Sequence, residues 1–225
     1  MAVSTNRDDD IYETARFNMV ECQQRPGGVR DARLVARLKQ IPREAFVAVE
    51  HSEIAYADCV LSCGVGSATR EMLSPLAFAL LVEMAAISPD DVVLDIAGGT
   101  GYGAAIMAGL AGAVIALEEH EPLSKIADAI WADLGIDNAV SVSAPLAQGV
   151  AKQAPFNVIF INGCVEEVPA ALLAQMEEGG RLVCVQMIMG CPKAVVYNRA
   201  GMATLKADVP APNLPQFSTP ATFQF

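Results

Sequence analysis

Two acidic side chains beside a run of glycines are the residues of this sequence best suited to bind a ligand. Asp95 is the last residue but one of the run 92–96, whose other residues are apolar, and a glycine-rich segment, 97–102, follows directly. Glu118 directly follows a second apolar run at 113–117. In open α/β sheets, ligands bind at the carboxyl ends of the strands. Both acids are therefore candidates to contact the same ligand.

The chemistry of the glycine-rich segment favours a zwitterionic ligand. Glycines let the backbone approach a ligand without a Cβ in the way. The helix expected from Tyr102 onward presents free N–H groups and the positive end of its dipole, which suit a carboxylate or a phosphate. Asp95 would repel a pyrophosphate but would attract an ammonium group, directly or through water. A ligand that carries an ammonium and a carboxylate matches both features.

Glu118 extends the predicted ligand to a nucleoside, because a carboxylate at this position can accept two hydrogen bonds from ribose hydroxyls, as it does in NAD-binding folds. An amino-acid tail joined to a nucleoside predicts S-adenosyl-L-methionine as the cofactor, with NAD as the alternative. Glu119 could take the same role, but we prefer Glu118 because it directly follows the strand. The predicted cofactor-contacting residues are Asp95, Gly98, Gly99, Thr100, Gly101, Tyr102, Glu118, Glu119 and Asn162.

Two of these residues have a second interpretation. Asn162 ends an expected strand on the ligand side, and it either lines the pocket or lies beside it. Tyr102 either covers the amino-acid portion of the ligand or packs its own helix.

The elements that must position these residues alternate between strands and helices from Leu73 onward, which predicts a parallel α/β sheet. Expected strands are 92–96, 113–117, 140–143, 158–162 and 181–185, with a hairpin at 194–198 and 202–206. Expected helices are 32–38, 42–49, 74–84, 102–110, 122–134 and 169–176. We therefore expect a Rossmann-like class I methyltransferase fold: a seven-stranded, mostly parallel sheet with a C-terminal antiparallel hairpin and an N-terminal helical and extended subdomain. A dinucleotide dehydrogenase would continue with further βαβ units.

The chain is expected to divide into an N-terminal, substrate-side region, 1–70, and a cofactor-binding domain, 71–225. A length of 225 residues with 53% hydrophobic content is enough for one large core.

Composition argues against several partners. The net charge of −11 and the pI near 4.6 leave no basic face for a nucleic acid or an anionic membrane. The longest apolar run, 76–87, is too short to span a bilayer, and residues 1–10 contain no apolar signal segment. The six cysteines form no CxxC pair and there are two histidines, so no metal site is expected. We expect a cytoplasmic protein with reduced thiols.

Several longer strings resemble the protein-L-isoaspartate O-methyltransferase family, in particular a divergent proteobacterial branch. The resemblance covers residues 17 to about 208. It is carried by the glycine motif and by the strings Met-Val-Glu at 19–21, Gln-Arg-Pro at 24–26, Ile-Pro-Arg-Glu-Ala-Phe-Val at 41–47, Ala-Tyr-Ala-Asp at 55–58, Met-Leu-Ser-Pro at 72–75, Ala-Pro-Phe-Asn-Val-Ile at 154–159, Val-Pro-Ala-Ala-Leu-Leu at 168–173 and Glu-Gly-Gly-Arg-Leu-Val at 178–183.

The resemblance implies an enzyme that transfers a methyl group to the α-carboxylate of isoaspartyl residues in damaged proteins. The ester then collapses to a succinimide, which reopens partly to aspartate. It also implies Ser74 and Leu73 as the residues nearest the methyl acceptor, Ala97 as the first position of the cofactor motif, and Ala144 beside the adenine. The partner would be a protein or peptide that carries isoaspartate, and the enzyme would be a monomer or a homodimer.

Departures from the family pattern leave two alternatives open. The family's acceptor-side serine is replaced by Leu73, its following histidine by Leu76, and a Gly-Asp-Gly string by Ser-Ala-Pro at 143–145. The chain could therefore methylate another carboxylate or a small molecule, or it could be a non-catalytic cofactor-binding adaptor. Arg70 could contact a substrate carboxylate, but we expect an exposed surface side chain. We assign no role to His51 or His120.

Overall fold

The computed structural model describes residues 5–217. Residues 1–4 of the segment 1–10, which was predicted to contain no signal segment, lie outside the described residues. A seven-stranded sheet forms the centre, with the strand order β5-β4-β3-β6-β7-β8-β9. The strands from β3 to β7 pair in parallel, and β7, β8 and β9 pair antiparallel. The strands are β3 (Val92–Ile96), β4 (Ala113–Glu118), β5 (Ala139–Ser143), β6 (Phe156–Val165), β7 (Met176–Ile188), β8 (Cys191–Asn198) and β9 (Ala203–Asp208).

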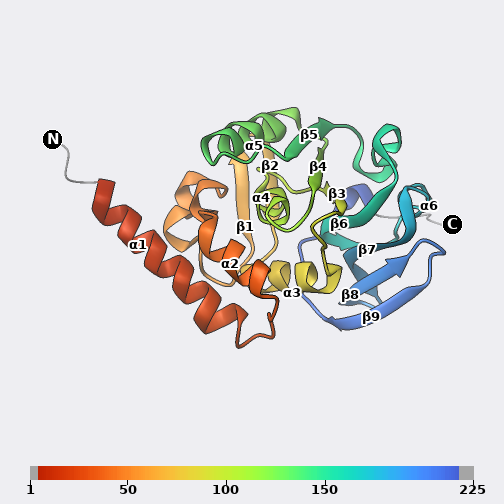
Figure 1. Ribbon diagram of the computed structural model, residues 1–225, viewed down its shortest axis with the longest axis horizontal. Helices are drawn as coiled ribbons and strands as arrows, with labels where there is room; N and C mark the ends of the chain where they lie inside the picture. The colour runs from red at the N-terminus through yellow and green to blue at the C-terminus, as the bar shows by residue number, and fades with distance from the viewer. Residues whose placement is uncertain (1–4, 218–225) are drawn as a thin grey trace, which may run out of the picture.

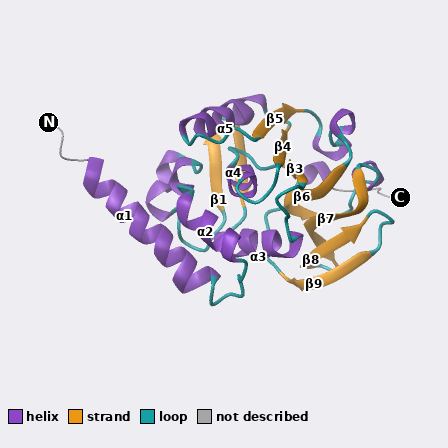
Figure 2. Ribbon diagram, viewed as in Figure 1, coloured by secondary structure: helices purple, strands orange, loops and turns teal. Residues whose placement is uncertain are grey.

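Helices cover the sheet, and a separate two-stranded hairpin stands beside it (Figures 1 and 2). The α-helices are α1 (Thr5–Asn18), α2 (Ala32–Gln40), α3 (Pro75–Ala85), α4 (Tyr102–Ala108), α5 (Glu121–Asp133) and α6 (Ala170–Leu173). The hairpin is formed by β1 (Leu61–Val65) and β2 (Ala68–Met72). A π-helix, η1 (Met19–Gln24), and five 3₁₀ segments complete the chain: η2 (Arg43–Ala45), η3 (Val49–Ile54), η4 (Leu146–Gln148), η5 (Ala151–Gln153) and η6 (Pro215–Phe217).

The fold class predicted from the sequence is confirmed. β3 and β6 are buried along nearly their whole length because helices cover both faces of a parallel sheet. The buried apolar side chains form two clusters. Side chains that precede residue 70, such as Leu34, pack in the same cluster as Val93 of the sheet. A domain boundary at residue 70 would fall inside β2, and it stays a prediction.

Two sequence predictions of secondary structure are wrong. The helix expected over 169–176 ends at Leu173, because Met176 already pairs with Phe156 as the first residue of β7. The helix expected over 42–49 forms only the 3₁₀ turn η2, because the chain turns away at residues 46–48 and the backbone amide of Ala48 donates to the carbonyl of Ser62 at 2.9 Å. The sequence carried no prediction for α1, which runs from Thr5 to Asn18 and projects from the body of the molecule (Figure 1). None of the helices within residues 5–217 is long and apolar enough to cross a membrane.

The start of α3 follows from its sequence. Ser74 is the N-cap, its hydroxyl accepts a hydrogen bond from the backbone N–H of Ala77, and Pro75 occupies the first turn. The helix ends at Ala86, which adopts a left-handed conformation with φ of 47°.

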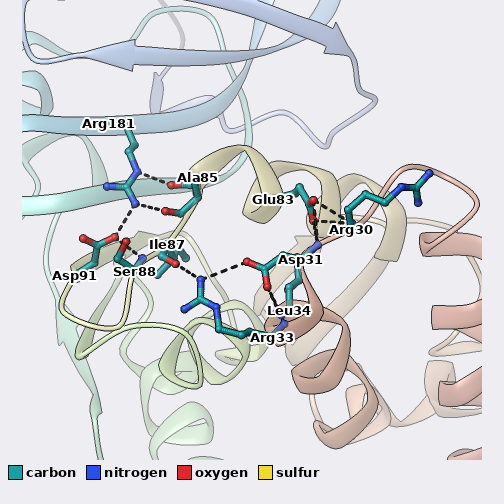
Figure 3. A network of polar contacts seen from close by, with 11 residues as sticks. Arg30, Asp31, Arg33, Leu34, Glu83, Ala85, Ile87, Ser88, Asp91 and Arg181 are labelled. Carbon is teal, nitrogen blue, oxygen red and sulfur yellow. Dashed lines mark hydrogen bonds and ion pairs between the residues drawn. The ribbon is translucent and has the colours of Figure 1, made fainter.

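Arginines neutralise the carboxyl end of α3 (Figure 3). Arg181 donates from Nε to the carbonyl of Ala85 at 2.5 Å, and from Nη2 to the carbonyl of Ala86 at 2.7 Å and to Asp91 at 2.6 Å. Arg33 donates to the carbonyl of Ile87 at 2.6 Å. Cations stabilise a helix at this end because its last carbonyls have no partner within the helix. This network lies at the amino end of β3, away from the glycine-rich segment.

We expect Arg181→Met to lower the free energy of unfolding by about 2 kcal/mol, because it removes charged hydrogen bonds from a partly buried helix end. Urea denaturation measures this change. Lys125→Met is the matched control, because the Lys125–Glu121 pair is exposed on the surface and its loss should be undetectable. Equal stabilities of the two variants would contradict the assigned role of Arg181.

Candidate functional site

The chain turns sharply between the end of β3 and the start of α4. Ala97, Gly99 and Gly101 all have positive φ, at 61°, 62° and 90°. A positive φ is unfavourable for residues other than glycine, so the backbone of Ala97 is strained. The backbone amide of Ala97 donates to the carbonyl of Leu117 at 2.9 Å, which ties the turn to β4.

The glycines of this turn are required by the protein's own packing. A Cβ on Gly98 would lie 2.6 Å from the carboxylate of Asp95. A Cβ on Gly101 would lie 2.5 Å from Trp131, whose Nε1 donates to the carbonyl of Gly101 at 3.0 Å. Trp131 was not among the residues predicted for the site, although Ala127 and Trp131 are spaced four residues apart and therefore share one face of α5.

Asp95 is fully buried at the carboxyl end of β3, and Asn162 of the neighbouring strand β6 holds it. The Asn162 amide donates from Nδ2 to Asp95 Oδ1 at 2.5 Å and to the carbonyl of Ile96 at 3.0 Å. The second carboxylate oxygen, Oδ2, is buried without a hydrogen-bond partner. An unpartnered buried oxygen leaves Asp95 able to accept a hydrogen bond from a further donor.

Burial raises the pKa of Asp95 to about 7, and the Asn162 hydrogen bond opposes this rise. The charge of Glu118 adds to the rise, and the backbone amide of Ala104 opposes it. The carboxyl therefore changes its protonation state near neutral pH. A cationic donor at Oδ2 would favour the ionised form.

Glu118 ends β4 and is paired with Arg70 of the hairpin. The Arg70 guanidinium donates from Nε to Oε2 at 2.7 Å and from Nη2 to Oε1 at 2.6 Å. The side chains are only 7% and 4% exposed, so the expectation that Arg70 is a surface residue is wrong. No sequence signal indicates this pair, because 48 residues separate its members. Burial lowers the pKa of the Arg70 guanidinium, but the hydrogen bonds and the charge of Glu118 outweigh this effect, so the net pKa is raised.

Tyr102 packs into an aromatic cluster instead of facing solvent. Its ring centroid lies 5.6 Å from that of Phe46 and 5.4 Å from that of Phe78. The guanidinium of Arg43, which is also buried, lies 4.8 Å from the ring centroid. The Tyr102 hydroxyl is buried without a hydrogen-bond partner. Arg43 lay in a string that carried the family resemblance, but its place beside Tyr102 was not foreseen.

Three other predicted site residues, Leu73, Ser74 and Thr100, make hydrogen bonds within the chain. Leu73 is buried, and its carbonyl accepts a hydrogen bond from Arg43 at 2.8 Å, whereas the hydroxyl of Ser74 caps α3. Thr100 is buried and donates to the carbonyl of Phe46. Ala144 follows β5 at the same edge of the sheet.

Two small cavities flank the glycine turn, and each encloses about 10 Å³. Such a cavity holds about one water molecule, whereas ligand pockets enclose roughly 300–1,000 Å³. Arg70 and Cys63 fill the space on one side of the turn, and Trp131 fills it on the other. One cavity is lined by residues that include Arg70, Leu73, Gly98, Gly99, Tyr102 and Asn162, and the other by residues that include Gly99, Gly101, Glu118 and Trp131.

One acidic cluster among the described residues has ligand atoms close enough for a metal ion, and it consists of Glu118, Glu119 and His120. Both oxygens of Glu118 already accept hydrogen bonds from Arg70, and Glu119 accepts one from Gln216. These bonds leave the cluster poorly suited to a cation, so the geometry adds no support for a metal site.

Known proteins of one family are similar to this chain over most of its length. The sequence model of the family described as Protein-L-isoaspartate(D-aspartate) O-methyltransferase matches residues 14–207. A protein-L-isoaspartate O-methyltransferase of Koribacter versatilis (strain Ellin345) is 38% identical over 168 residues, which cover 75% of this chain and 74% of that protein. Protein-L-isoaspartate O-methyltransferase 2 of Shewanella sediminis (strain HAW-EB3) is 32% identical over 92% of this chain and 82% of its own length.

Solved structures show the same fold. A protein-L-isoaspartate O-methyltransferase superposes with a TM-score of 0.76 at 25% identity, covering 90% of this chain and 65% of that one. A Plasmodium falciparum protein described as a putative protein-L-isoaspartate O-methyltransferase, in complex with S-adenosyl-L-homocysteine, gives a TM-score of 0.75 at 19% identity, covering 89% of this chain and 98% of that one.

The raised pKa of Asp95 predicts a pH-dependent effect of Asp95→Asn on folding stability. At a pH below the ordinary pKa of 3.8, both the folded and the unfolded chain carry the proton. Between that value and about 7, only the folded chain keeps it, so the wild type loses stability relative to the variant as pH rises. We expect a slope of roughly 1.4 kcal/mol per pH unit within this window.

Urea denaturation of both proteins at a series of pH values measures this slope. Asp90→Asn is the control, because Asp90 is exposed in a turn. A difference between wild type and Asp95→Asn that stays constant with pH would show that Asp95 is ionised throughout.

Proposed function

This chain belongs to the protein-L-isoaspartate(D-aspartate) O-methyltransferase family, and we propose that it transfers a methyl group from S-adenosyl-L-methionine to the carboxylate of isoaspartyl residues in damaged proteins. The observation that carries this proposal is the free oxygen of Asp95. It lies at the carboxyl end of the central strand, beside a glycine turn, in a chain whose family match spans both features.

The donors and acceptors of the site fit the cofactor. Asp95 Oδ2 would accept a hydrogen bond from the ammonium group, with Asn162 fixing the carboxylate. The N–H groups of the glycine turn and the first turn of α4 would hold the carboxylate. Glu118 would accept from the ribose hydroxyls. The remaining proposed contacts are Ala97, Gly98, Gly99, Thr100, Gly101, Tyr102, Glu119 and, on the adenine side, Ala144.

The space around these groups does not fit the cofactor as it stands. Each of the two flanking cavities encloses about 10 Å³, so Arg70 on one side, or Trp131 on the other, must move before a nucleoside can enter. The donor set therefore lies in a site with little free volume.

The reaction needs little acid–base assistance from the protein. S-adenosyl-L-methionine supplies a methyl group on a sulfonium, which is a good leaving group. The acceptor carboxylate is nucleophilic at neutral pH without a general base. The contribution of the chain is therefore to hold the two groups close and in line, with Leu73 and Ser74 nearest to the acceptor.

A second candidate is methyl transfer to another carboxylate. It is favoured by Leu73, whose apolar side chain lines the cavity beside the glycine turn, where the family carries a serine. The two candidates share the cofactor and differ only in the acceptor.

We include a cytoplasmic location in the proposal. All six cysteines are free, and Cys63, Cys164 and Cys184 are buried in the core. A damaged protein or peptide is the proposed partner, and a monomer or homodimer the proposed assembly.

We expect the chain to transfer base-labile methyl groups to an isoaspartyl peptide, and none to the same peptide with normal aspartate. Incorporation of tritiated methyl measures this. Asp95→Ala, purified in the same way, controls for enzymes of the expression host. Equal incorporation into both peptides would favour the second candidate, and no incorporation into either would exclude isoaspartyl methylation.

We further expect Asp95→Ala to weaken binding of S-adenosyl-L-homocysteine by ~1–3 kcal/mol, which is about 5- to 150-fold, because it removes a hydrogen bond to a charged group. Isothermal titration calorimetry at neutral pH measures the dissociation constant. The exposed control Asp90→Ala should bind as the wild type does. Unchanged binding by Asp95→Ala would remove Asp95 from the site.

A further inference from the structure

The acid assigned to the ribose already has a complete set of partners within the chain. Arg70 occupies both oxygens of Glu118 through two hydrogen bonds of 2.7 and 2.6 Å. Backbone amides complete the set: Gly99 donates at 3.3 Å, Glu119 at 2.9 Å and His120 at 3.2 Å. A planar guanidinium matches a carboxylate in this two-pronged way, and ribose hydroxyls would have to use the same oxygens.

The hairpin that carries Arg70 also packs against the glycine turn. Arg70 of β2 pairs directly with Cys63 of β1. A Cβ on Gly99 would lie 2.5 Å from the Cys63 sulfur and 3.6 Å from Arg70 Cβ. Figure 1 shows the hairpin beside α4 and next to α5, the two helices that flank the turn. Arg70 therefore neutralises Glu118, and together with Cys63 it fills the space in front of the turn.

Arg70 has a second place available to it. It lines the small cavity at the glycine turn, and it also lines a larger groove of about 270 Å³. The groove is bounded by the hairpin, His120 and residues 212–216. Glu119 lies on this side, 3.4 Å from Arg70 Nη2. A guanidinium that leaves Glu118 can therefore keep an acidic neighbour while it turns toward the groove.

We propose that Arg70 sets the affinity of the nucleoside subsite by acting as an internal competitor: it occupies Glu118 in the cofactor-free chain, and the ribose must displace it toward the groove. This inference rests on the proposed function and deepens it. Binding then carries the cost of separating a buried ion pair, so the measured affinity is that of the open site reduced by the fraction of molecules in which it is open.

The proposal predicts opposite changes in two quantities when Arg70 is replaced. Arg70→Met removes the competitor, so S-adenosyl-L-homocysteine should bind at least about tenfold more tightly. The same variant leaves Glu118 buried without its cation, so the ligand-free protein should melt at a lower temperature. A residue that only supports the structure of the site would instead lower both the affinity and the melting temperature.

Calorimetry with S-adenosyl-L-homocysteine is the primary measurement, and fluorescence of Trp131 is an independent one. Trp131 is the one tryptophan of the chain and lines the small cavity that Glu118 also lines. Its emission should change on binding, and the change should saturate at lower ligand concentration in Arg70→Met. Arg181→Met is the matched control, because it removes a comparable ion pair far from the site and should leave the affinity unchanged.

If Arg70→Met does not fold, Arg70→Lys tests the proposal in its place. Lysine keeps the charge but loses the two-pronged geometry, so its affinity should lie between those of the wild type and Arg70→Met. Equal or weaker binding by the Arg70 variants, with normal binding by the wild type, would overturn the competitor role and leave the proposed function standing. Absence of binding by the wild type and by every variant would overturn both.

Discussion

Burial of two carboxylates at the ends of adjacent parallel strands is the constraint on which the site depends. Asp95 and Glu118 are 0% and 3% exposed. A carboxylate withdrawn from water either finds donors or takes up a proton. The chain uses both solutions. The guanidinium of Arg70 pairs with Glu118. Asp95 accepts a hydrogen bond from the Asn162 amide and a smaller stabilisation from the backbone amide of Ala104, and its pKa is still raised to about 7.

The glycine turn follows from the same constraint. The carboxylate of Asp95 lies against Gly98, and the indole of Trp131 lies against Gly101, each at a distance that excludes a Cβ. These positions must therefore be glycine even before a ligand is considered. The close approach that would let a cofactor reach the backbone is used here by the protein's own side chains, which is why the site has almost no free volume.

The hairpin connects the acceptor side of the molecule with the cofactor side. Arg70 reaches from the hairpin to the end of β4, while Leu73, just past the hairpin, lines the same cavity and accepts a hydrogen bond from Arg43. A movement that frees Glu118 would therefore also change the surroundings of Leu73. If the proposed displacement of Arg70 occurs, the cost of opening the site lowers the measured affinity for the cofactor.

The sequence by itself determined the order of strands and helices from residue 73 onward, the strand–turn–helix around Asp95, and the family, because these depend on local hydrophobic pattern, glycine spacing and contiguous strings. It also placed Asp95, Glu118 and Asn162 at one edge of the sheet, since parallel strands bring their carboxyl ends together. Only the tertiary structure decided that Arg70 is buried on Glu118 and that Trp131 packs on Gly101. Both contacts join residues 30 or more positions apart, and side-chain partners at such separations depend on how the hairpin and α5 pack, which no local pattern encodes.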